Sequence, residues 1–162
     1  MALDTDQRSM RDWLDSYSQD HQRPINRLLH WICVPPIVWG GMALLWTVPV
    51  PSSLLKPGAW AVFTIVLMFA WYWKRSHRLG AALLIALAIL AVVCAWTFEQ
   101  LGPVSMRWLA IGVFVAAWIG QFIGHVFEGR RPSFFTDLAY LLVGPAWLMD
   151  KLLNRIGLKE KP

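Results

Sequence analysis

The sequence predicts an all-α membrane protein with a single helical domain. Hydrophobic residues make up 57% of its 162 positions and eleven residues are tryptophan, whereas soluble domains contain about 45–50% apolar residues. Several apolar runs also approach the roughly 20 residues that a helix needs to cross a bilayer. We therefore expect a polytopic helical bundle in which residues 1–162 form one membrane domain.

The expected elements follow one another along the chain. Residues 1–23 form an interfacial segment with an amphipathic helix, because Trp13, Leu14 and Tyr17 recur at helical spacing. The next helix begins at Pro24, since proline suits the first turn of a helix and disfavours helix in the residue before it. Four membrane-spanning helices are then expected at Leu28–Val48, Ala59–Trp73, Leu79–Phe98 and Met106–Phe127.

A fifth apolar run, Phe134–Met149, contains Asp137 and the Gly144-Pro145 pair. Proline removes a helix hydrogen bond, so this run is expected to interrupt its helix and form either a re-entrant segment or a fifth apolar helix. The bundle is thus expected over residues 24–149, followed by a basic tail over residues 150–162.

Lysine and arginine residues favour four spans. These residues accumulate on the cytoplasmic side of membrane proteins, and four spans place thirteen of the 15 on one side, whereas five spans give nine against six. Both termini are therefore expected in the cytoplasm, in a bacterial inner membrane or an endoplasmic reticulum membrane according to the source. Residues 1–22 show no signal peptide, and the net charge of +5 is explained by these flanks without nucleic-acid binding.

The four histidines, His21, His30, His77 and His125, are all predicted on this same side. Imidazole is a common ligand of redox metals and titrates near neutral pH. His77 lies within the basic stretch 74–78, where a solvated position is the simpler interpretation. The isolated Cys33 and Cys94 are expected to be packing residues.

Two polar stripes surround the other histidines. Asn26 and His30 are four residues apart, and Gln121, His125 and Glu128 follow at spacings of four and three. Each stripe could be an interhelical hydrogen-bond set. Together they also indicate a metal site, in which Asn, Gln or Glu side chains hold the second nitrogen of each imidazole.

The two motifs resemble a known family. Two elements of the chain are similar to the signature of the yeast metabolism-of-phytosphingosine-to-odd-numbered-fatty-acids protein family. They are Tyr17-x3-His21-x4-Asn26-x3-His30 and Gln121-Phe-x-Gly-His125-x2-Phe-Glu128. Nearly the whole chain takes part in the resemblance. The sequence departs from the pattern at Ser133, where alanine is expected after Pro132.

The resemblance implies a membrane-bound iron(II)-dependent dioxygenase that shortens 2-hydroxy fatty acids by one carbon and uses O2 as co-substrate. It makes His21, His30 and His125 the expected iron ligands, with His77 as a further candidate. It also places three residues beside the metal or the substrate: Asn26, Gln121 and Glu128. Membrane lipids are the other expected partners, and the oligomeric state stays open.

Two alternatives belong to other classes of protein. A diiron hydroxylase or desaturase needs about twice as many histidines in clustered patterns, which four scattered histidines do not supply. A non-catalytic small integral membrane protein would use the same His and Glu residues as interhelical packing contacts. Stoichiometric metal in the purified protein distinguishes this last alternative from the dioxygenase.

Overall fold

The computed structural model describes residues 8–51, 54–135 and 137–159. Within these ranges the chain is helical and contains no strand, which confirms the all-α class. The helices are α1 (Met10–Gln19), α2 (Pro24–Trp46), α3 (Ala59–Arg75), α4 (His77–Glu128) and α5 (Tyr140–Arg155), with a short 3-10 helix, η1 (Ser133–Phe135). Parts of the predicted interfacial segment and basic tail, residues 1–7 and 160–162, lie outside the described residues, as does residue 136.

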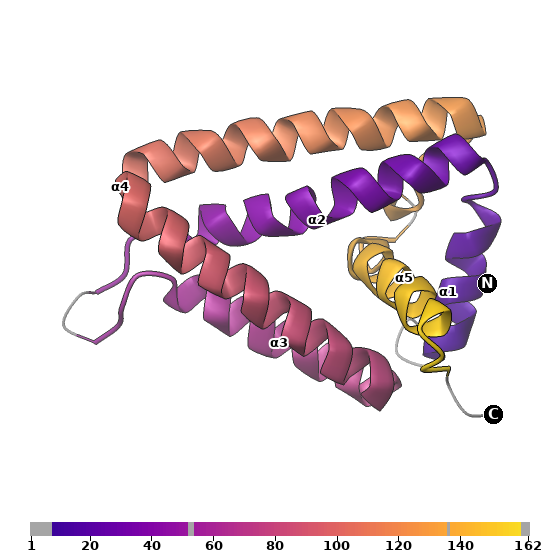
Figure 1. Cartoon of the computed structure of the whole chain (residues 1–162), viewed down its shortest axis with the longest axis horizontal. Helices are drawn as coiled ribbons and strands as arrows, with labels where there is room; N and C mark the ends of the chain where they lie inside the picture. Colours follow the sequence, from indigo (N-terminus) through magenta and orange to yellow (C-terminus); the bar gives the residue numbers. More distant parts are fainter. Residues whose placement is uncertain (1–7, 52–53, 136, 160–162) are drawn as a thin grey trace.

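The long helix α4 bends at Gly102 and gives the molecule a V shape (Figure 1). Gly102 has φ 69° and ψ 173°, a conformation that glycine adopts without steric cost. Pro103 follows and suits the first turn of the second half. The third and fourth expected spans therefore share one helix with a sharp bend, where the sequence suggested a loop between Phe98 and Met106.

Each half of α4 has one partner helix. Figure 1 shows α3 along the first half and α2 along the second.

Two helices in the described part of the chain, α2 and α4, are long and apolar enough to cross a membrane. Large apolar side chains on the outside of both arms, such as Val66, Val92 and Val115, are more than half exposed. An apolar surface of this kind suggests association with a membrane.

Glycines let α2 approach the second half of α4 closely. A Cβ atom on Gly120 would lie 2.5 Å from the Cys33 sulfur, and one on Gly124 would lie 2.5 Å from Oδ1 of Asn26. Small residues at such spacing allow helix backbones to pack tightly. The N-terminal end of α2 is thereby held against the C-terminal end of α4.

Helices α1 and α5 pack together across the open end of the V (Figure 1). Helix α1 begins with a capping box between Ser9 and Asp12. Its apolar face is buried, and Trp13 meets Tyr140 edge to face with ring centroids 4.9 Å apart. The helix was predicted correctly, but its apolar face packs on α5 instead of facing a membrane surface.

Helix α5 corrects the expected interruption at Gly144-Pro145. It continues through Pro145 to Arg155, past the predicted boundary at residue 149. Gly144 has a packing role, because a Cβ atom there would lie 3.2 Å from the Tyr17 hydroxyl. Close packing of α5 on α1 offsets the loss of one helix hydrogen bond.

Candidate metal centre

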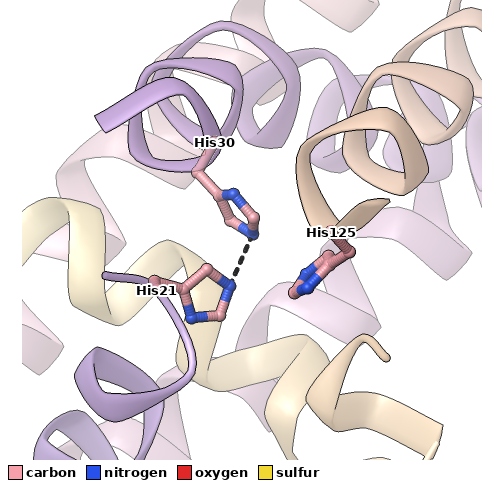
Figure 2. A group of neighbouring side chains, drawn as sticks. All are labelled: His21, His30 and His125. Atoms are coloured by element: carbon pink, nitrogen blue, oxygen red, sulfur yellow. Dashed lines mark hydrogen bonds between the residues drawn. The ribbon is translucent and has the colours of Figure 1, made fainter. Parts of the chain in front are cut away.

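Three of the four histidines converge where α1, α2 and α4 meet (Figure 2). His21 comes from the turn between α1 and α2, His30 from α2 and His125 from the last turn of α4. All three are buried, and their potential ligand atoms lie within 4.8 Å of one another. His77 does not join them: it is exposed and contacts the Trp73 ring edge-on at a centroid distance of 4.6 Å.

Backbone carbonyls orient two of the rings. Nδ1 of His21 lies 2.6 Å from the carbonyl oxygen of Tyr17, and Nδ1 of His30 lies 2.9 Å from the carbonyl oxygen of Asn26. Because a carbonyl oxygen can only accept, both Nδ1 atoms carry the proton. Main-chain oxygens therefore hold these nitrogens, where the sequence suggested Asn, Gln or Glu side chains. Backbone carbonyls are common partners of metal-binding histidines.

With both rings in this orientation, the lone pair on Nε2 of His21 and the lone pair on Nε2 of His30 point toward each other. Nε2 of His21 and Nε2 of His30 are 3.0 Å apart (Figure 2). Two neutral imidazoles that already donate through Nδ1 cannot form a hydrogen bond through Nε2, so a cation between them is required for attraction. Burial holds the pKa of His21 below its usual value, which disfavours a proton as that cation at neutral pH.

The separation of these nitrogens fits one metal ion. Two ligands bound about 2.1 Å from an ion at a right angle lie about 3 Å apart. His125 adds a third imidazole, with ring centroids 4.9 Å from that of His21 and 5.4 Å from that of His30. Its Nδ1 is buried and has no hydrogen-bond partner in the described residues. The donor set fits a divalent first-row metal, although imidazoles alone suit several of these metals.

Glu128 ties the turn that carries His21 to the end of α4. Its carboxylate accepts hydrogen bonds from the backbone N–H groups of Gln22 at 2.9 Å and Arg23 at 3.0 Å. It also accepts one from Nδ2 of Asn26 at 3.1 Å. A carboxylate at the unpaired N–H groups that precede α2 is favourable. Glu128 and Asn26 thus hold the ligands in place from one side.

Gln121 lies deeper, on the wall of a cavity of about 60 Å³. His30 and His125 also line this cavity, together with residues of α1, α2, α4, α5 and the segment between α4 and α5. The amide nitrogen Nε2 of Gln121 is buried and has no hydrogen-bond partner in the described residues. A free donor next to the histidines can bind an oxygen atom of a ligand.

Tyr17 is a site residue to which the sequence assigned no role, although it begins the first motif of the family resemblance. Its ring stacks on His21 with centroids 4.0 Å apart, and it lines the same cavity. Trp147 packs against both rings, with its centroid 5.7 Å from that of Tyr17 and 5.8 Å from that of His21, and it donates a hydrogen bond from Nε1 to the Ser18 hydroxyl at 2.8 Å. Helical periodicity assigned Tyr17 only to an apolar face. Its place in that motif, four residues before His21, is the signal for its closer role.

Comparisons with known proteins cover almost the whole chain. A family model described as "2-hydroxy-palmitic acid dioxygenase Mpo1-like" matches residues 7–156, which include all three clustered histidines. The 2-hydroxy-palmitic acid dioxygenase MPO1 of Saccharomyces cerevisiae is 31% identical over 151 residues, or 91% of this chain and 82% of the yeast protein. No solved structure matches significantly.

Proposed function

The chain belongs to the Mpo1-like family, and we propose from this membership that it is an iron(II)-dependent dioxygenase that shortens 2-hydroxy fatty acids by one carbon. The observation that carries the proposal is the contact of His21 and His30, whose unprotonated nitrogens lie 3.0 Å apart. Such a pair is stable when it shares a cation. The name of the yeast relative supplies the reaction class and the kind of substrate.

His21, His30 and His125 would hold the iron ion through imidazole nitrogens. Bound iron(II) supplies the redox chemistry with O2 that the amino-acid side chains here lack. The Tyr17 and Asn26 carbonyls keep His21 and His30 in the tautomer that leaves Nε2 free. Burial of the three rings would limit the access of water to a bound ion.

Gln121 is the proposed substrate contact among the polar residues. Its unpartnered Nε2 would donate a hydrogen bond to the carboxylate or hydroxyl oxygen of the 2-hydroxy acid. Asn26 and Glu128 act as positioning residues, since they contact each other and the turn of His21. Of the three polar residues expected beside the metal, one would thus contact the substrate and two would position the ligands.

We further propose four membrane spans, formed by α2, α3 and the two halves of α4, with both termini in the cytoplasm. Exposed apolar side chains on both arms support this topology. The distribution of lysine and arginine residues also supports it. The three histidines then lie near the cytoplasmic boundary, where the polar head of a fatty acid also lies.

Metal analysis of the purified protein tests the function. We expect about one iron per chain after anaerobic loading, and a product one carbon shorter when a 2-hydroxy fatty acid and O2 are added. A variant with alanine at His21, His30 and His125 should lose both. The His77→Ala variant is the matched control, since it removes an exposed histidine.

Absence of metal and of turnover in the loaded wild-type protein would contradict the proposal. The histidines would then be packing residues of a non-catalytic membrane protein. Metal binding without turnover of any 2-hydroxy fatty acid would retain the site but overturn the reaction.

A further inference from the structure

A second cavity adjoins the histidine cavity inside the V. Its volume is about 190 Å³, and it lies between α2, the first half of α4 and α5. Both cavities share three lining residues, namely Val34, Val38 and Pro145. The two cavities therefore meet where α5 crosses α2.

The chemistry of the two cavities differs. The first contains two of the clustered histidines and the free amide of Gln121. Every residue that lines the second is apolar, and Leu83, Ala86 and Leu90 form its wall on α4. Seven residues separate Leu83 from Leu90 along the helix, which corresponds to a length of about 10 Å.

A chamber that contains imidazole and amide groups, joined to a wholly apolar chamber, matches a ligand with a small polar head and an alkyl tail. We propose that the second cavity binds the acyl chain of the 2-hydroxy fatty acid while its head lies at the histidines. This inference rests on the proposed function, which identifies the polar head of the ligand as a 2-hydroxy acid. The apolar chamber then determines which chain lengths fit.

The shared wall at Val34 and Pro145 supports a single ligand over two separate ones. All three shared residues have apolar side chains, so no polar side chain separates the two chambers at this crossing. Ala86 is the smallest side chain on the α4 wall, and a larger residue there would project into the chamber. Ala88 lies two residues further on and is exposed, so it provides a matched position outside the chamber.

Photo-crosslinking tests the proposal without turnover. The probe is 2-hydroxypalmitic acid with a diazirine near its methyl end, added anaerobically to the iron-loaded, full-length protein in lipid nanodiscs. We expect crosslinks on peptides of α4 around Leu83–Leu90 and on α5, and suppression of these crosslinks by excess unlabelled 2-hydroxypalmitic acid. Ala86→Phe should reduce them at least fivefold, whereas Ala88→Phe should leave them unchanged.

Chain-length preference gives a second readout. Ala86→Phe should shift turnover toward shorter 2-hydroxy acids, and Leu90→Ala should shift it toward longer ones, with metal content showing that each variant is folded. Crosslinks confined to outward positions such as Ile89 and Val92, or equal effects of Ala86→Phe and Ala88→Phe, would overturn the acyl site. Turnover without crosslinks in the chamber overturns this inference alone. Displaceable crosslinks in the chamber without turnover retain a fatty-acid site and overturn the dioxygenase.

Discussion

Helix α2 and the second half of α4 carry a polar contact at each of their two ends, and the two contacts are built differently. Near the bend of α4, Arg107 donates two hydrogen bonds to Thr47. Its Nε donates to the hydroxyl at 3.3 Å and its Nη2 donates to the carbonyl oxygen at 2.9 Å. The Thr47 hydroxyl in turn donates to the Leu44 carbonyl at 2.9 Å. In this contact Nε and Nη2 of Arg107 and the Thr47 hydroxyl each have a protein acceptor, and Arg107 is exposed, so its other N–H groups can reach solvent.

The opposite end of the same helices is incomplete. The Nε2 atoms of His21 and His30 face each other with lone pairs, and Nδ1 of His125 has no hydrogen-bond partner in the described residues. Buried polar atoms without partners are costly. The first contact is thus satisfied by the two helices themselves, whereas the second leaves buried nitrogen atoms without a protein partner and could hold a metal ion.

Of the three substitutions that test this difference between the two ends, removal of one histidine should have the largest effect on metal binding. We expect His125→Ala to lower metal affinity and turnover by more than about 100-fold, beyond the 10- to 100-fold loss typical of a residue behind the ligands. The yield of folded protein should stay near that of the wild type. Metal content, steady-state turnover and circular dichroism check this outcome, and wild-type activity in the variant would remove the proposed site.

A methyl group between the helices should have the next largest effect. In Gly124→Ala the new Cβ atom would lie 2.5 Å from Oδ1 of Asn26. Because the Asn26 carbonyl holds His30, displacement of Asn26 should reduce metal affinity by about 10- to 100-fold. The control is Gly112→Ala on the same half of α4, where nothing lies within 4 Å of the new atom. Equal metal affinity in the two variants, measured by titration, would show that this close approach does not determine the site.

Removal of the contact between Arg107 and Thr47 should have the smallest effect. It should lower the stability of the fold without changing metal binding. Arg107→Ala removes two hydrogen bonds to Thr47, and we expect the free energy of unfolding to fall by about 1 kcal/mol. Denaturant unfolding in detergent measures this change, and metal content should stay at the wild-type level. A loss of metal in this variant would mean that the two ends are coupled.

Much of the helical framework was predictable because apolar runs and proline positions are local signals. The start of α2 at Pro24 and the helical character of the four apolar runs both follow from them. The bend at Gly102 was harder to predict, since a Gly-Pro pair within apolar sequence is equally compatible with a loop. Similarly, periodicity identifies the apolar face of α1 but cannot tell whether it meets a membrane or α5.

The site was only partly predictable for a related reason. Helical spacing placed Gln121, His125 and Glu128 on one stripe, but it could not show that main-chain oxygens hold His21 and His30. Those contacts depend on how the chain turns between α1 and α2. Tyr17 and Trp147 reach the site through the packing of α1 on α5, which joins distant parts of the chain.

The distance along the chain between the proposed ligands determines when the site can exist. His21 and His30 leave the ribosome early, whereas His125 follows after nearly all of α4, and Trp147 after most of the remainder. A nascent chain therefore carries two ligands and an open third position until the end of α4 has been synthesised. A bound ion would join α1 and α2 to the end of α4, so retention of metal would report a chain in which these helices are correctly assembled.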